Sequence, residues 1–267
     1  MRFLVLLLIL SCPALAASSD ADFLAARDAF AKGQIARLDE LAPGLRSHPL
    51  ALYVEYWQLR SHLNEAPKAD IRRFLEDNSG QLPANRLRAD WLRLLARQKD
   101  WPEFLREYSP LVDADLDLQC SSLQARLANR DSGAVKDAKA LWFAGRELPE
   151  SCTPVFESML ATGTLGEDDV WARTRLAFEA GNTTLAKAVA SYLPTGRRLD
   201  PKAVDGVVRN PQRFLEAKSV ATKTKAQREL LLFALGRTAG NVPGAAADAW
   251  RRVQHQLPED DRAYGWG

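Results

Sequence analysis

The sequence has few of the side chains from which metal sites and nucleophilic centres are usually built. Its 267 residues include three histidines and three cysteines. The histidines, His48, His62 and His255, lie far from the cysteines along the chain, and no cysteine belongs to a CxxC pair. A reactive cysteine needs a neighbouring base or cation that lowers its pKa. We therefore predict no metal site, no cofactor and no cysteine nucleophile.

An excess of either charge is also absent. Thirty-six basic residues are balanced by 34 acidic ones, for a formal net charge of +2. Binding to phosphates needs clustered lysine and arginine, whereas charges of both signs are interspersed here, as in residues 70–77. This pattern is typical of solvated helix faces and predicts no nucleic-acid partner.

The apolar run at the N-terminus is too short to span a bilayer. Arg2 precedes the apolar residues 3–10, and small residues follow at 14–17, whereas a transmembrane helix needs about 20 apolar residues. This arrangement predicts a secretory signal peptide over residues 1–16, cleaved after Ala16, and a mature domain of residues 17–267 without a transmembrane segment. Lipidation of Cys12 is an alternative that Ile9-Leu10-Ser11 disfavours, because these residues depart from a lipoprotein signal.

Two cysteines, Cys120 and Cys152, remain after this cleavage. An even number of cysteines in a protein exported to an oxidising compartment favours a disulfide. The alternative is a pair of unrelated buried thiols, since cysteine is among the residues most often buried. We predict a disulfide between Cys120 and Cys152.

Helix signals occur along nearly the whole chain, whereas alternation typical of strands is missing. Leu52, Tyr56, Leu59 and Leu63 recur at the helical spacing, and the β-branched run 204–208 is interrupted by an aspartate and a glycine. The sequence therefore predicts an all-α fold. The helices are expected near residues 50–63, 69–78, 83–97, 101–108, 116–128, 134–144, 154–161, 167–180, 183–192, 201–209, 211–217, 225–239 and 243–256.

Short connections between these helices predict antiparallel pairs. Five turns resemble one another, each ending a helix at a glycine or basic residue and opening the next with a polar one; they are residues 31–34, 97–100, 128–131, 179–182 and 238–241. Their uneven spacing excludes a strict 34-residue repeat. We predict a right-handed superhelical stack of helical hairpins, an irregular α-solenoid of the tetratricopeptide kind.

Aromatic side chains can pack in the core or stack on sugars. Five tryptophans lie on or beside apolar helical stripes and are expected in the core: Trp57, Trp91, Trp142, Trp171 and Trp250. Trp101 opens a helix beside Asp100 and is the best candidate for an exposed ring.

The mature chain resembles the soluble lytic murein transglycosylases of Gram-negative bacteria over most of its length. The segments that carry this resemblance are 48–50, 53–57, 90–97, 100–101, 118–120, 123–126, 140–142, 148–152, 169–173 and 180–182. The resemblance implies a periplasmic enzyme with a long N-terminal α-superhelix and a separate C-terminal lysozyme-like domain. That domain cleaves peptidoglycan between N-acetylmuramic acid and N-acetylglucosamine, and one glutamate performs the acid and base chemistry that yields a 1,6-anhydro product.

The family's catalytic glutamate lies in a Glu-Ser pair followed downstream by a Gly-x-Met-Gln segment. Glu157-Ser158 is such a pair, but the only methionines are Met1 and Met159, so that segment is missing. We therefore expect Glu157 to lie on a solvated helix surface and the chain to contain no catalytic residue. The parent enzyme's partners would be peptidoglycan glycan strands, whereas an alternative function is a periplasmic solenoid adaptor that binds a protein partner.

Residues 257–264 have the proline and acidic residues of a helix start. An isolated helix of about 8 residues is marginal in water, so we expect the superhelix to be truncated in mid-repeat. An unpaired last hairpin would expose an apolar face, which we expect at Leu230, Leu231, Ala234, Trp250 and Val253.

Overall fold

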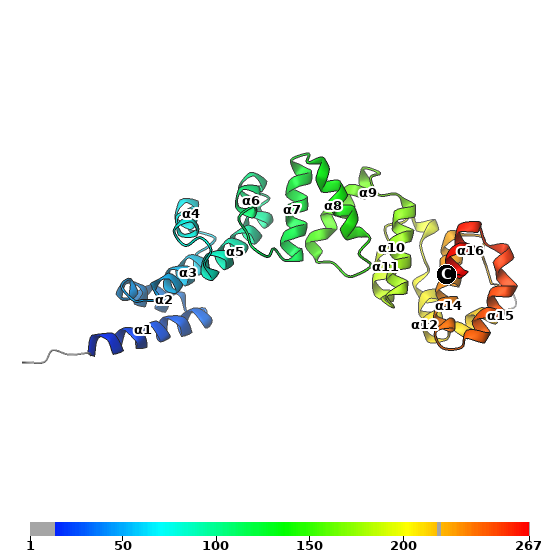
Figure 1. Ribbon diagram of the computed structural model, residues 1–267, viewed down its shortest axis with the longest axis horizontal. Helices are drawn as coiled ribbons and strands as arrows, with labels where there is room; N and C mark the ends of the chain where they lie inside the picture. The colour runs from blue at the N-terminus through cyan, green and yellow to red at the C-terminus, as the bar shows by residue number, and fades with distance from the viewer. Residues whose placement is uncertain (1–13, 218–219, 267) are drawn as a thin grey trace, which may run out of the picture. The chain divides into compact units, whose positions relative to one another are not determined.

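The computed structural model describes residues 14–217 and 220–266 of the chain. Within these residues the chain forms sixteen α-helices and four short 3₁₀ helices and no strand (Figure 1), which confirms the predicted all-α fold. None of the helices described is long and apolar enough to cross a membrane. Cys12 and residues 1–13 of the predicted signal peptide lie outside the described residues.

The chain divides into two compact units, which we call the N-terminal unit, up to Ala125, and the C-terminal unit, from Arg126 onward. Within the N-terminal unit, helices that are near in sequence pack together: α1 with α2, α3 with α5, and α5 with α6. Its helices are α1 (Ala14–Ala31), α2 (Ile35–Leu41), η1 (Ala42–Leu45), α3 (Ala51–Ser61), α4 (Lys68–Asp77), α5 (Leu82–Gln98), α6 (Trp101–Tyr108) and most of α7 (Leu116–Ala128).

The core of the N-terminal unit is built from apolar stripes of period 3.6. On α5 the stripe consists of Leu87, Trp91, Leu94 and Leu95, all buried. Neighbouring helices contribute further buried aromatic and aliphatic side chains to the same cluster, among them Trp57, Ile71, Phe74 and Phe104.

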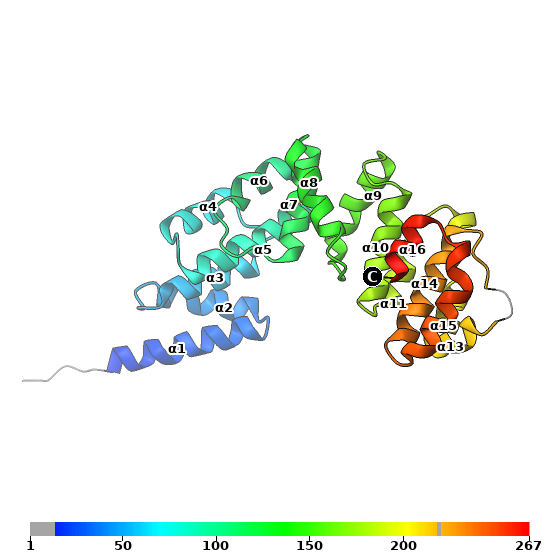
Figure 2. The same ribbon diagram turned by 45° about the vertical axis from the view of Figure 1, so that its right-hand side comes forward.

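The C-terminal unit is also a stack of helical pairs (Figure 2), in which α10 packs with α11 and α14 with α15, while α10 and α16 both pack against α14. Its helices are α8 (Ser132–Trp142), η2 (Glu150–Cys152), α9 (Thr153–Ala161), α10 (Glu167–Glu179), α11 (Thr183–Ala190), η3 (Thr195–Arg197), α12 (Pro201–Arg209), α13 (Pro211–Leu215), α14 (Lys225–Ala239), α15 (Pro243–Val253), η4 (Gln254–Gln256) and α16 (Glu259–Trp266).

Four of the five predicted turns share one backbone geometry. Gly33, Lys99, Arg130 and Gly181 all have positive φ, between 56° and 72°. In each turn the amide of this residue donates to the carbonyl three residues back, and the next amide donates to the carbonyl five residues back, which satisfies the last carbonyls of the preceding helix. The fifth turn differs, because Gly240 has φ of −64°.

The prediction of an exposed apolar face at the end of the chain is wrong. All five side chains named for it are buried, including Leu231 and Trp250 at 0 and 6 % exposure. The reason is that α16 is not isolated. It packs against α14, and Asp261 is buried in hydrogen bonds to Arg175 and Arg228.

Candidate functional site

The residues singled out from the sequence are placed at different points in the structure. Cys120 on α7 and Cys152 at the end of η2 are both buried and disulfide-bonded, so the structure contains a disulfide. Their pairing with each other stays a prediction for peptide mapping. His48 hydrogen-bonds Asp20 at 3.0 Å and His62 hydrogen-bonds Asp39 at 2.9 Å.

Most of the tryptophans are buried or partly exposed as predicted. The five expected in the core are buried. Trp101 is only partly exposed, because its ring meets the Phe104 ring edge-on with centroids 6.0 Å apart and packs against the core of the N-terminal unit. It therefore offers less free aromatic surface than the sequence suggested.

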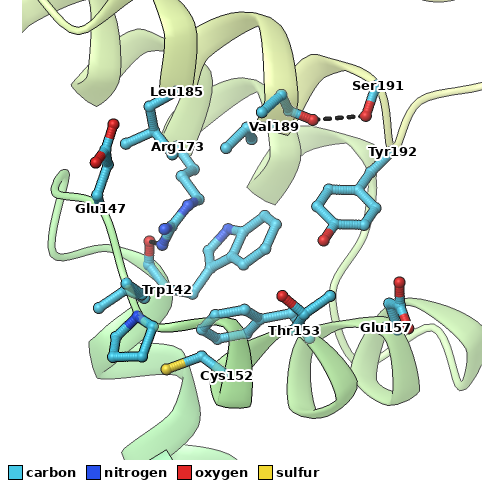
Figure 3. Close-up of a pocket in the computed structure, with 14 residues that line it drawn as sticks. Trp142, Glu147, Cys152, Thr153, Glu157, Arg173, Leu185, Val189, Ser191 and Tyr192 are labelled. Carbon is cyan, nitrogen blue, oxygen red and sulfur yellow. Dashed lines mark hydrogen bonds between the residues drawn. The ribbon is translucent and has the colours of Figure 1, made fainter. Parts of the chain in front are cut away.

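The strongest candidate for a binding site is a cavity of about 470 Å³ in the C-terminal unit. This volume lies in the range of small-molecule sites. Its walls come from α8 and the segment after it, from η2 and α9, and from α10 and α11 with the two residues that follow α11 (Figure 3). The lining residues are Trp142, Glu147, Leu148, Pro149, Cys152, Thr153, Phe156, Glu157, Arg173, Leu185, Ala188, Val189, Ser191 and Tyr192.

Aromatic rings form the centre of this cavity. Trp142 ends α8, and its indole N–H donates to the carbonyl of Asp169 at 2.9 Å, which fixes the ring. Phe156 meets the indole nearly edge-on at 5.0 Å, and the Tyr192 ring lies 6.1 Å from it. In Figure 3 the indole lies between the side chains of Arg173 and Tyr192. Tyr192 is 37 % exposed, whereas Trp142 is buried, so Tyr192 offers the accessible ring.

Arg173 is the charged group inside the cavity and is only 3 % exposed. It comes from the buried face of α10. Its Nη1 donates to the carbonyls of Leu141, at 3.3 Å, and Trp142, and its Nη2 donates to the carbonyl of Arg146 at 3.3 Å. Two of these carbonyls end α8, where the helix dipole favours a cation. The guanidinium carbon also lies 4.8 Å from the centre of the Trp142 ring.

No acidic side chain of the described residues forms an ion pair with Arg173, although most other buried charges of the chain are paired. Burial lowers the pKa of this guanidinium, as expected for a cation removed from water. The free energy of an unpaired buried charge is high, so its carbonyl contacts compensate it only in part.

Two exposed carboxylates flank the cavity on opposite sides in Figure 3. Glu147 accepts a hydrogen bond from Nδ2 of Asn182 at 3.0 Å. Glu157, the glutamate of the Glu-Ser pair, lies on α9 near Tyr192, whose pKa is raised by burial and by the Glu157 charge. Glu157 thus lies on an exposed helix surface, as predicted, but it also lines a cavity, which the sequence did not indicate.

The cavity is suited to binding rather than to covalent chemistry. Its aliphatic hydroxyls belong to Thr153 and Ser191, and the Ser191 hydroxyl donates to the carbonyl of Ala188. Nucleophilic catalysis needs a base hydrogen-bonded to the hydroxyl, and the lining residues include no histidine or lysine. Among the described residues, no group of three or more metal-binding side chains is found.

Arg173 was not among the residues to which the sequence patterns gave a role. Its position was nevertheless visible in part, because Arg173 shares the helical stripe of Val170, Thr174 and Ala177, which are buried. An arginine on an otherwise small and apolar stripe indicates a buried cation. The sequence cannot show which carbonyls accept hydrogen bonds from Arg173, since these carbonyls lie on α8 and the following segment.

The fold and the cavity define an all-α protein built from stacked antiparallel helical pairs, with a candidate binding site in its described part. No family model matches the chain. Curated relatives do: the soluble lytic murein transglycosylase of Escherichia coli K12 is 28 % identical over 214 residues, 80 % of this chain and 33 % of the relative. That of Salmonella typhimurium LT2 is 28 % identical over 190 residues, 71 % of this chain and 29 % of the relative.

Solved structures of lytic transglycosylases match the chain as well. The 70 kDa soluble lytic transglycosylase of Escherichia coli matches 93 % of this chain with a TM-score of 0.69 and 26 % identity. The lytic transglycosylase Slt of Pseudomonas aeruginosa matches 96 % with a TM-score of 0.69 and 27 % identity. This chain covers 40 and 41 % of those two chains.

These matches confirm the resemblance found in the sequence. The chain is a homologue of soluble lytic murein transglycosylases over 80 % of its length. It spans about a third of the length of the curated relatives it matches.

Proposed function

We propose that this chain is the non-catalytic helical scaffold of a periplasmic lytic transglycosylase. The parent enzyme would cleave the bond between N-acetylmuramic acid and N-acetylglucosamine in peptidoglycan and form 1,6-anhydro products. The chain would reach the periplasm through its signal peptide, contact glycan strands or position the catalytic domain, and be inactive by itself.

The observation that carries this proposal is the extent of the similarity. The chain matches relatives named soluble lytic murein transglycosylase over 80 % of its own length but over only 33 % of theirs. Two thirds of each relative therefore lies outside the matched region, which leaves room for a separate catalytic domain.

The environments of the carboxylates support the same proposal. A glycosidase acid needs a carboxyl group in an apolar cleft that is free to protonate the leaving oxygen. The buried glutamates Glu103, Glu107 and Glu229 are each bound to an arginine, Arg72, Arg88 and Arg175 respectively, while Glu157 is exposed on α9. An ion-paired carboxylate is a poor proton donor, and a solvated one lacks the required pKa control.

The test is incubation of the purified chain with murein sacculi. We expect no anhydromuropeptides above a blank, because no carboxyl group among the described residues is held for proton transfer, and we expect the chain to be retained on sacculi. Chromatography with mass spectrometry measures the soluble products, and sedimentation measures retention. Product release that disappears in Glu157→Gln but persists in Glu150→Gln, an exposed glutamate outside the cavity, would overturn the proposal.

A further inference from the structure

The cavity in the C-terminal unit contains a cation whose hydrogen-bonding capacity is not used up by the protein. Arg173 has five N–H donors, and three are accounted for by the carbonyls of Leu141, Trp142 and Arg146. Within the described residues, its Nε hydrogen and one Nη2 hydrogen donate no hydrogen bond. A purely structural helix cap would not require this residue to line an open cavity.

The unused donors have a chemistry that selects a carboxylate. Nε and Nη2 are neighbouring nitrogens of the planar guanidinium, and the donors of this group match the two oxygens of a carboxylate or phosphate. The buried position of Arg173 strengthens such an interaction, because the charge is weakly screened by water. An anionic ligand group would also neutralise the charge that no acidic side chain of the described residues neutralises.

The rim restricts the ligand further. Glu147 and Glu157 flank the cavity and are exposed, so they repel a ligand whose charges are all negative and attract an ammonium group. This disfavours phosphates and free dicarboxylates. The partly exposed ring of Tyr192 lies between Arg173 and Glu157 in Figure 3 and can contact the apolar part of a bound chain.

We propose that this cavity binds a short peptide that carries a free carboxylate and an ammonium group, with the carboxylate on Arg173 and the ammonium on Glu157. Its volume of about 470 Å³ is sufficient for a few amino-acid residues. The source that fits a scaffold of a peptidoglycan enzyme is the peptide part of peptidoglycan. This choice of source, but not the peptide chemistry, rests on the proposed function.

The first experiment measures binding of matched peptides to the full chain by isothermal titration calorimetry. The probe is N-acetyl-Ala-Ala-Lys with a free C-terminal carboxylate. The same peptide with a C-terminal amide should bind at least about tenfold more weakly, because a charge-assisted bidentate contact is lost. The peptide with an acetylated lysine should bind about three- to fivefold more weakly, because the Glu157 contact is exposed and screened.

Three variants test which side chain makes each of the two contacts with the peptide. In Glu157→Gln, the free and acetylated lysine peptides should bind equally, while the preference for the free carboxylate remains. Glu150→Gln removes an exposed carboxylate on the neighbouring η2 that does not line the cavity and should leave both preferences unchanged. Arg173→Lys keeps the positive charge but loses the planar fork, so it should lose most of the discrimination against the amide.

A replacement variant and a defined negative result ensure that the proposal can be tested. If Arg173→Lys does not fold, as judged by thermal unfolding, Tyr192→Ala replaces it, because that side chain is on the rim and its loss should weaken all peptides alike. Equal binding of the acid and the amide by the wild-type chain, or binding of neither, would overturn the proposal.

A second arm tests the source of the peptide separately. Peptides released from purified sacculi by an amidase should displace the probe. If they fail to compete while the probe still binds through its carboxylate, the assignment to peptidoglycan is wrong and the peptide site remains. Failure of the scaffold function itself is seen independently, as anhydromuropeptide release by the chain or as its absence from sedimented sacculi.

Discussion

The two units use buried charge in different ways. In the N-terminal unit the buried carboxylates of α6 pair with arginines on nearby helices: Glu103 with Arg72 and Glu107 with Arg88, 31 and 19 residues apart. In the C-terminal unit Arg175 binds Glu229 at 2.6 Å and Asp261 at 3.0 Å, 54 and 86 residues away. The charge pairs of the first unit join α4 and α5 to α6, whereas those of the second join α10, α14 and α16.

This difference indicates that the C-terminal unit depends more on long-range contacts than the N-terminal unit does. A local ion pair forms as soon as adjacent helices pack, and its loss affects one interface. The network around Arg175 also holds the last helix: Arg228 donates to Asp261 at 2.7 Å, and the Arg175 guanidinium lies 4.0 Å from the centre of the Tyr264 ring. Removing one member therefore leaves several charges uncompensated at once.

Substitution at the centre of the network is expected to have the largest effect. Glu229 is 1 % exposed and accepts two hydrogen bonds from Arg175. Glu229→Ala should lower the free energy of unfolding by about 3–5 kcal/mol, because it removes the bidentate partner of Arg175 and leaves Arg175, Lys225 and Arg228 to share Asp261. Denaturant unfolding followed by circular dichroism measures the change.

The matched control lies in the N-terminal unit. Glu107→Ala removes a carboxylate that is 6 % exposed and bound to one arginine, and it should cost about half as much, because it breaks a single ion pair whereas Glu229 is bound by both Arg175 and Lys225. An equal loss of stability in both variants would show that the long-range network stabilises the protein no more than a single ion pair does.

A covalent constraint is expected to have the second largest effect. If Cys120 and Cys152 are joined, they close a loop of about 33 residues, and the chain-entropy estimate for such a loop is about 3–4 kcal/mol. Alkylation of the unfolded, unreduced chain should label neither cysteine, and proteolytic mapping should recover one linked peptide pair. Labelling of both cysteines would contradict the pairing, and reduction should lower the free energy of unfolding.

The packing of α16 can be disrupted by a substitution that leaves every charged residue in place. A Cβ atom added at Gly265 would lie 2.6 and 2.8 Å from two atoms of the Trp250 ring and 3.0 Å from Leu232. Gly265→Ala should therefore displace α16 and cost about 1–3 kcal/mol. Hydrogen exchange should show faster exchange in residues 259–266, while helices of the N-terminal unit keep their protection.

Gly236→Ala is the matched control for this substitution. Gly236 lies within α14, and a Cβ atom there would meet no atom within 4 Å. The change should stabilise the protein by about 0.5–1 kcal/mol through helix propensity alone. A similar loss of stability in both variants would mean that glycine at 265 is not required by its contact with Trp250.

The sequence predicted the features that local interactions determine. The helix from 116 to 128 and the one from 201 to 209 were predicted at their observed bounds, because apolar period, proline and caps are all encoded within a few residues. The docking of α16 was missed because it depends on Arg175, 86 residues from Asp261. The cavity was missed for the same reason, since Arg173 meets carbonyls about 30 residues before it in the chain.

The smallest expected effect concerns the shared turns. Asp100 and Asn182 follow the left-handed residue of their turns and accept a hydrogen bond from the amide three residues on, so they cap α6 and α11. Gln34 occupies the same position before α2 with nearly the same backbone conformation, φ −84° and ψ 69° against −78° and 71° for Asp100, but makes no such bond. Its side chain is too long to reach back to the helix amides.

Gln34→Asp should therefore stabilise the chain by about 0.5–1 kcal/mol, because it adds a cap where the backbone is already in place. Gln34→Glu carries the same charge near the helix N-terminus without the short side chain, so it should gain only the dipole contribution of a few tenths of a kcal/mol. The difference between the two variants, measured as the shift in the denaturation midpoint, isolates the capping bond. Equal shifts would indicate that the turns of the two units share a backbone geometry but that capping contributes little to either.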